Sequence, residues 1–247
     1  MRRNPERTAW GVLLIAFSVF CLLAVSIPLG LRWYVLTATR PHMTQLEVIS
    51  GTVLVQAPGQ ASAIGITDAG QIAEQGQAKT DETSWATLTF FDESDAVIYS
   101  KTELQILKAR TRRFGMSSQP DLVSLKVSGG RVRLSVAPHN DQERLFEVHT
   151  PHSVVSMKEG SYSVEVTDES TEIAVRDGEA VVAGNGGIIE VSRGERTAVL
   201  IGEPPAAPMP ATRDFLKNGN FRDGLNHWWV YNEQGVDGGV INGTAEV

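Results

Sequence analysis

The sequence predicts an extracytoplasmic all-β domain, either a β-sandwich or a short β-solenoid, preceded by one transmembrane helix. Residues 10–31 form an uncharged apolar run, which is typical of a membrane span. Residues 45–202 are a succession of short β-rich runs separated by Gly, Asp, Asn and Ser, which is typical of an all-β domain. The formal net charge of −7 over 247 residues argues against nucleic acid as a partner.

The predicted transmembrane helix runs from Trp10 to Leu31. At about 1.5 Å per residue it is roughly 33 Å long, enough to cross a hydrocarbon core of about 30 Å. Trp33 and Tyr34 follow it as interfacial anchors, and Pro28 is expected to bend or end it. A cleaved signal peptide is the alternative, with 37–39 as the cleavage site, but the run is longer than a signal peptide needs. We therefore expect an uncleaved anchor.

The charges around this helix predict its orientation. Arginines at 2, 3 and 7 precede it, and Arg32 and Arg40 follow it. The excess of positive charge before the helix places the N-terminus inside the cell. We expect residues 1–9 to be a short cytoplasmic N-terminus and residues 32–44 a juxtamembrane segment. The chain is then a single-pass protein of the cell membrane with its C-terminal part outside.

Within the β-rich region, the clearest strand is 132–136. Its alternation puts Val132, Leu134 and Val136 on a buried face, with the side chains at 131, 133 and 135 on the other face. The glycines of the preceding segment 128–130 predict a tight hairpin. Asp177-Gly178 predicts a second turn, between the runs 173–176 and 179–182.

Residues 203–212 form a Pro-rich segment that predicts a semi-rigid linker. Residues 213–247 then begin a second module, too short for an independent core unless it continues beyond this chain or packs on the first domain. Trp228 is expected to be buried. Trp229 and Tyr231 are candidate ligand contacts, because aromatic rings stack on the apolar faces of sugars.

A basic cluster is the other candidate contact site for a ligand or partner. It could meet an acidic polymer or lipid headgroups, and the alternative is a solvated loop. The cluster consists of Lys108, Arg110, Arg112 and Arg113. His149 and His152 flank Pro151, which breaks the spacing that a metal site on a helix requires. The sequence contains no recognised catalytic motif, so we expect a non-enzymatic protein without metal or cofactor.

The β-rich region resembles the FecR domain, an extracytoplasmic module of membrane regulators. Ordered pieces of sequence carry the resemblance: 51–55, 76–80, 86–92 with Ser94, 146–151, 160–164, and 176–182 with 194–195. Glu93 stands where the family has glycine, and 158–161 replaces the usual Arg-Gly-Thr. The resemblance implies a bacterial, membrane-tethered domain that contacts another protein or the envelope. A sigma factor is not an expected partner, because only nine residues precede the helix.

The C-terminal stretch 218–228 resembles the opening of jelly-roll carbohydrate-binding modules. Arg222 takes the place of a glutamate that helps such modules hold calcium, so no calcium site is expected. Two functions follow from the two resemblances. The first is a sensory or protein-interaction module at the cell envelope. The alternative is an envelope glycan-binding protein that uses the C-terminal module, with the FecR-like domain as a spacer.

Overall fold

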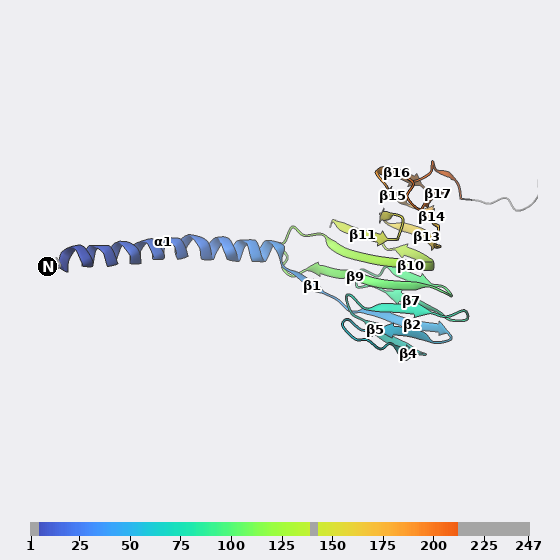
Figure 1. Ribbon diagram of the computed structural model, residues 1–247, viewed down its shortest axis with the longest axis horizontal. Coiled ribbons are helices and arrows are strands. Elements are labelled where there is room, and N and C mark those ends of the chain that lie inside the picture. The colour runs from blue at the N-terminus through green and yellow to red at the C-terminus, as the bar shows by residue number, and fades with distance from the viewer. Residues whose placement is uncertain (1–4, 139–142, 212–247) are drawn as a thin grey trace, which may run out of the picture.

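The computed structural model describes residues 5–138 and 143–211. It begins with α1 (Pro5–Thr37), which projects away from a β domain (Figure 1). Residues 9–37 are long and apolar enough to cross a membrane, and none of this stretch is buried in the protein. The helix continues through Pro28 and past Leu31, because a proline removes only one backbone N–H from the helical ladder. The expected juxtamembrane segment, residues 32–44, therefore begins within the helix and leaves it after Thr37.

The β domain consists of two sheets in a closed, barrel-like arrangement. In sheet A the hydrogen-bonded order is β4, β3, β6, β9, β10, β11, β12, β15, β16, with β1 beside the end of β9. Its strands are β1 (Thr39–Pro41), β3 (Val53–Gln56), β4 (Ile64–Ile66), β6 (Gln77–Thr80), β9 (Glu103–Arg112), the first part of β10 (Asp121–Val136), β11 (Arg144–His149), β12 (Val154–Met157), β15 (Glu179–Gly184) and β16 (Gly187–Ser192).

In sheet B the order is β5, β2, β7, β8, β10, β13, β14, β17, β18. Its strands are β2 (Thr44–Ser50), β5 (Ala69–Ile72), β7 (Trp85–Thr89), β8 (Asp95–Ile98), the second part of β10, β13 (Gly160–Val166), β14 (Ser170–Asp177), β17 (Glu195–Leu200) and β18 (Met209–Pro210). Among these pairings only β10 with β11 is parallel.

Strand β10 joins the two sheets. Its first half pairs with β9 and β11 in sheet A, and its second half lies between β8 and β13 in sheet B. The hairpin predicted at 128–130 is wrong, because the chain continues along β9 and then bends into the other sheet. Gly130 has φ +91, and a Cβ there would lie 2.5 Å from the carbonyl oxygen of Lys101. The glycine therefore allows a kink within one strand.

One hydrophobic core lies between the sheets. Val132, Leu134 and Val136 are buried in it and Arg133 is exposed, which confirms the predicted facing of this strand. Phe90 and Phe146 meet edge to face across the core, with ring centroids 6.0 Å apart. The turn at 177–178 is present, but it carries the chain from sheet B to sheet A, because β14 and β15 do not pair with each other.

The Pro-rich segment lies along β17 as far as the structure describes it. Thr197 donates to the carbonyl of Ala206 (2.6 Å), and the Ala206 N–H donates to Ala198 (2.9 Å). Pro205 is buried. Proline suits the edge of a sheet because no further strand requires its N–H. Residues 203–211 are thus docked on the domain where the sequence suggests a spacer. The expected second module, with Trp228, Trp229 and Tyr231, lies outside the described residues.

Candidate functional site

The outer face of sheet B carries a groove of about 370 Å³ that crosses β10, β13 and β14. We call it the arginine groove, because three arginines and no acidic residue line it. The lining residues are Arg131, Arg133, Ser161, Tyr162, Ser163, Ala174, Val175, Arg176, Gly194 and Ala211. The groove is therefore positively charged, although the protein as a whole has a net charge of −7.

Strand periodicity and register form the groove. Alternation along β10 turns Arg131 and Arg133 outward while their neighbours enter the core. In the register, Ser163 lies opposite Arg133, and Ala174 lies opposite Ser163. Two small side chains therefore follow a long one across neighbouring strands. This leaves a depression beside the guanidinium groups.

Arg131 is held in place by its neighbours. Its guanidinium lies over the ring of Tyr99, 5.4 Å from the ring centroid. Its Nε donates to the hydroxyl of Ser163 (3.4 Å). The aromatic face attracts the cation without cancelling its charge. Arg131 is therefore oriented at the edge of the groove and still cationic.

Arg133 and Arg176 are exposed, and within the described residues neither side chain makes a hydrogen bond or an ion pair. The acidic groups next to the groove include two with arginine partners of their own: Glu172 with Arg196 (3.1 Å), and Asp177 with Arg193 (3.5 Å). A guanidinium presents a planar fork of donors that matches a carboxylate or a phosphate. The groove is thus equipped to bind an anion.

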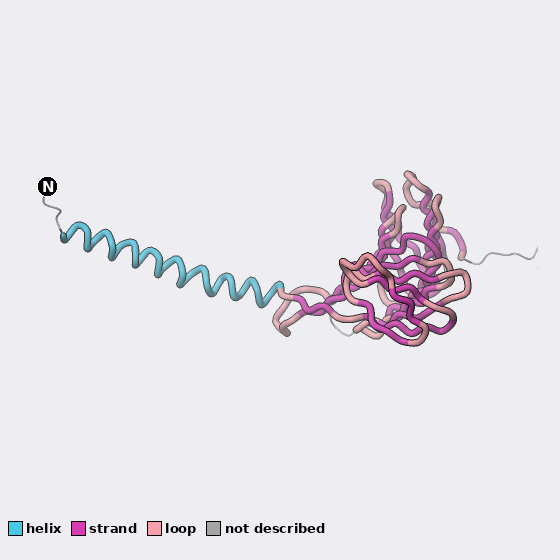
Figure 2. Tube along the Cα trace, turned by 60° about the horizontal axis from the view of Figure 1, so that its bottom comes forward, coloured by secondary structure: helices cyan, strands magenta, loops and turns pink. Residues whose placement is uncertain are grey.

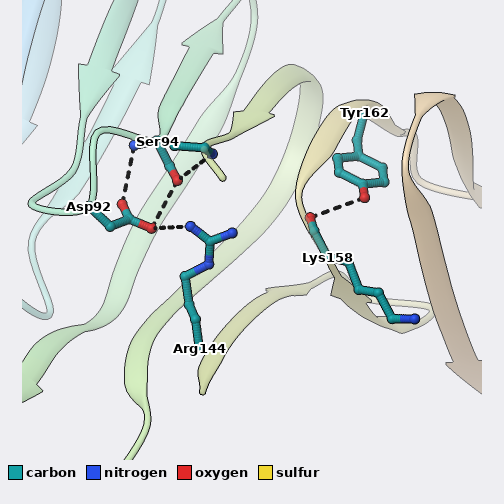
Figure 3. A network of polar contacts seen from close by, with 6 residues as sticks. Asp92, Ser94, Arg144, Lys158 and Tyr162 are labelled. Atoms are coloured by element: carbon teal, nitrogen blue, oxygen red, sulfur yellow. Dashed lines mark hydrogen bonds and ion pairs between the residues drawn. The ribbon is translucent and has the colours of Figure 1, made fainter. Parts of the chain in front are cut away.

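Tyr162 fixes the corner at one end of the groove (Figure 3). Its side chain is buried, and its hydroxyl lies 2.9 Å from the carbonyl oxygen of Glu179 and 3.1 Å from that of Lys158. The same oxygen accepts from the Glu179 N–H (3.2 Å). Burial raises the pKa of this phenol. The contacts tie the turn before β13 to the turn after β14, so the strands that carry Ser163 and Arg176 are held together.

A second buried network secures the end of β10 (Figure 3). Arg144 Nη1 lies 3.1 Å from Asp92 Oδ2, and these side chains are 6% and 1% exposed. Asp92 also accepts from the hydroxyl of Ser94 (2.9 Å). The Ser94 hydroxyl in turn accepts from the N–H of Ala137, the residue after β10. This network holds the strand that presents Arg133.

The predicted basic cluster lies elsewhere, at the end of the domain next to α1. Lys108, Arg110 and Arg112 are on β9, and Arg113 follows the strand. Arg110 forms a two-pronged ion pair with Glu74, with contacts of 2.7 and 2.8 Å. Partial burial favours a raised pKa for Glu74, but the hydrogen bonds from Arg110 and from the backbone outweigh it and lower this pKa. Arg110 is therefore already neutralised, while Lys108 and Arg113 remain exposed.

The two histidines contact different neighbours. His149 lies 3.5 Å from Glu147, and His152 contacts the hydroxyl of Thr171 (3.0 Å). Among the residues that the structure describes, no group of three or more His, Cys, Asp or Glu side chains is arranged to hold a metal ion. The sequence indicates the arginine groove only through Arg131 and Arg133, which alternation places on one outward strand face. The same pattern is equally typical of an ordinary solvent-exposed strand.

Over the described residues, the protein is an all-β domain with a cationic groove, carried on one apolar helix. Residues 76–181 match the protein family described as FecR protein, which confirms the resemblance seen in the sequence. The match includes β10, β13 and β14, and so all three arginines of the groove.

Two crystal structures of a protein from Parabacteroides distasonis, provisionally described as an anti-sigma factor, are similar to the chain. Sequence identity is 17% and the TM-score 0.43 for both. The alignments cover 54% and 60% of this chain, and 59% and 64% of those chains. The chain thus spans less than two thirds of their length. No curated protein is similar enough to the chain to count as a match.

Proposed function

We propose that this protein is a membrane-anchored regulatory module of a bacterial cell envelope. It acts by binding another protein and not by catalysis. Its arginine groove binds an acidic, extended segment of that partner. The observation that carries the proposal is the pair Arg133 and Arg176, two exposed cations without a partner in the described chain, beside a floor of small side chains. The FecR match supports the regulatory class of function.

The spacing of the arginines favours an extended peptide. Arg131 and Arg133 are two residues apart on β10, so their Cα atoms are separated by about 7 Å. Carboxylates two residues apart on an extended acidic segment have the same spacing. Arg176 is on β14, about 10 Å across from β10 and two residues beyond Ala174, the position level with Arg133, so it reaches the segment from its other side. The groove thus presents three donors to one anionic strand.

The anchor and the orientation complete the proposal. The apolar part of α1 is long enough to span a bilayer. The arginines before it favour an N-terminus inside the cell, which places the β domain outside the cytoplasm. The groove would then face the partner in the envelope. The glycan-binding alternative depends on residues 213–247 and gains no support from the described residues.

The test uses the full-length chain in zwitterionic nanodiscs and a fluorescein-labelled peptide of four Glu-Ala repeats. Fluorescence anisotropy measures its Kd. Exposed charge pairs contribute up to about 1 kcal/mol each, so Arg133→Gln with Arg176→Gln should weaken binding on the order of tenfold. The matched control is Lys126→Gln, which removes one charge from the same strand, β10, at an exposed position outside the lining. Its Kd should stay within about twofold of the wild-type Kd.

Two results would overturn this proposal. The first is unchanged peptide affinity in the double variant. The second is binding of polyglucuronate, but not of the peptide, that depends on Arg133 and Arg176. That result would assign the groove to an acidic glycan. A peptide of four Lys-Ala repeats should not bind, which checks that the interaction depends on charge sign.

A further inference from the structure

The loop that joins β9 to β10, residues 113–120, lies against the last turns of α1. We call it the junction loop. The rings of Tyr34 and Phe114 meet edge to face, with centroids 5.9 Å apart. The hydroxyl of Ser117 donates to the carbonyl of Leu36 (2.7 Å), and the Arg113 N–H donates to Ala38 (2.9 Å). The helix and the domain are therefore held together by these contacts as well as by the chain itself. Figures 1 and 2 show where the end of α1 meets the domain.

These contacts fix the depth of the junction loop relative to a bilayer. If the run ending at Leu31 fills the hydrocarbon core, Tyr34 and Leu36 lie about 5–8 Å beyond it, at about 1.5 Å per helical residue. The headgroup layer on each side of the core is about 5–8 Å thick. Phe114 and Ser117, which touch these two residues, therefore lie at the level of the headgroups.

The exposed side chains around the loop suit that position. Met116 is 77% exposed at the loop, and Trp33 on α1 is 69% exposed. Arg40 on β1 and Arg113 are exposed, and neither side chain makes a hydrogen bond or an ion pair in the described residues. An apolar tip flanked by arginines is the arrangement that binds an anionic membrane surface.

The register spreads positive charge over both faces of the β1–β9 ribbon. Arg40 lies opposite Thr111, while Thr39 lies opposite Arg112, so the two arginines point to opposite sides. The acidic Glu74 on this side of the domain is already engaged with Arg110. Positive charge therefore remains available beside the helix end.

We infer that the junction loop is a second membrane contact, specific for anionic phospholipid. Met116 enters the boundary between headgroups and acyl chains, and Arg40 and Arg113 bind lipid phosphates. This inference rests on the membrane anchor of the proposed function. A helix together with a second contact fixes the tilt of the domain, so the arginine groove faces a constant direction relative to the bilayer.

The test measures depth with single spin labels on the full-length chain, by electron paramagnetic resonance with oxygen and a nickel chelate as relaxants. Nanodiscs contain phosphatidylcholine with or without one quarter phosphatidylglycerol. The native Cys21 in α1 reports the anchor. In a Cys21→Ser background, Met116→Cys reports the loop. Ile188→Cys on the β15–β16 hairpin is the control, since Ile188 is 72% exposed and thus similar to Met116.

We expect the label at 21 to be deep, the label at 116 to lie at the headgroup level in anionic nanodiscs, and the label at 188 to be in water. Arg40→Gln with Arg113→Gln should shift the label at 116 toward water, by roughly fivefold in the docked-to-undocked ratio for each charge. Omitting phosphatidylglycerol should shift it in the same direction.

The outcomes separate this inference from the proposed function. A label at 116 as aqueous as that at 188, with the label at 21 deep, overturns the membrane contact and leaves the anchor standing. Equal docking of 116 with and without anionic lipid overturns the role of the arginines. An aqueous label at 21 removes the anchor and the inference together. Peptide binding in the groove is measured independently of all three.

Discussion

Replacing Arg144 by methionine tests how far the ion pair with Asp92 stabilises the domain. The two side chains are 6% and 1% exposed, so removing the cation leaves a carboxylate buried with only Ser94 as its partner. Breaking a buried pair in this way costs about 3–5 kcal/mol. For a domain of this size, 1 kcal/mol corresponds to roughly 2–4 °C in Tm. We therefore expect Tm to fall by about 6–20 °C.

The assay is thermal unfolding, which gives Tm, and urea unfolding, which gives the free energy. Both use the full-length protein in detergent and near-ultraviolet circular dichroism, and the urea data form a double-mutant cycle. Asp92→Asn with Arg144→Met should recover part of the loss, because asparagine leaves no unpaired charge. A coupling energy of about 2 kcal/mol or more is expected. The matched control is the exposed pair of Lys101 and Glu82, whose contact is shorter at 2.8 Å but whose side chains are 68% and 78% exposed.

Glu82→Gln should leave the unfolding midpoint unchanged, because solvent screens an exposed pair. A coupling energy for Asp92 and Arg144 within about 0.5 kcal/mol of zero would refute the reasoning. It would mean that the network of Figure 3 is held by packing and not by charge.

Four further predictions concern single positions; the first three are measured by thermal unfolding and the fourth by titration. Leu134→Asp places an unpaired charge at a fully buried position and should unfold the domain. Arg133→Asp should change the free energy of unfolding by only about 0.5 kcal/mol. Equal melting temperatures for the two variants would contradict the strand facing. Tyr162→Phe removes the hydroxyl that contacts the backbone N–H and carbonyl of Glu179. The free energy of unfolding should fall by about 1–3 kcal/mol, and an unchanged Tm would refute this prediction. Glu93 has φ +63, so Glu93→Gly should raise stability by about 0.5–1 kcal/mol, and a lower Tm would show that the turn tolerates glutamate without strain. Hydrogen bonds within its turn lower the pKa of Asp81 from 3.8 to about 2. The stability that the ionised carboxylate contributes is therefore complete above pH 3.8 and is lost as the pH falls toward 2. A nuclear magnetic resonance titration midpoint near 3.8 would contradict this.

The long apolar helix and the facing of single strands could be predicted from the sequence, because they depend on local patterns. The alternation around Leu134 places its side chain correctly, since a strand has a period of two whatever it pairs with. Pairing partners could not be predicted in the same way. The pair Gly129-Gly130 suits a hairpin or a kink, and Thr102, 29 residues from Arg131, decides between them by bonding to it.

The candidate site shows the same limit more strongly. Arg131 and Arg133 share a strand face in the sequence itself. Arg176 joins them only because β13 lies between β10 and β14, a relationship that no local pattern encodes. The basic cluster on β9 is conspicuous in the sequence, yet Arg110 is neutralised by Glu74 from a distant segment. Clusters in sequence and clusters in space therefore differ for the charged residues of this protein.

Strand β10 gives the domain a mechanical property. It starts one loop away from the helix contact at Phe114 and ends beyond Arg133, with 16 residues and roughly 50 Å of backbone in between. Since β9 and β10 pair along most of their length and both meet the helix end through the loop between them, a movement of α1 is passed to two paired strands together. The domain should therefore keep one orientation relative to α1, so the direction of the helix sets the direction in which the groove faces.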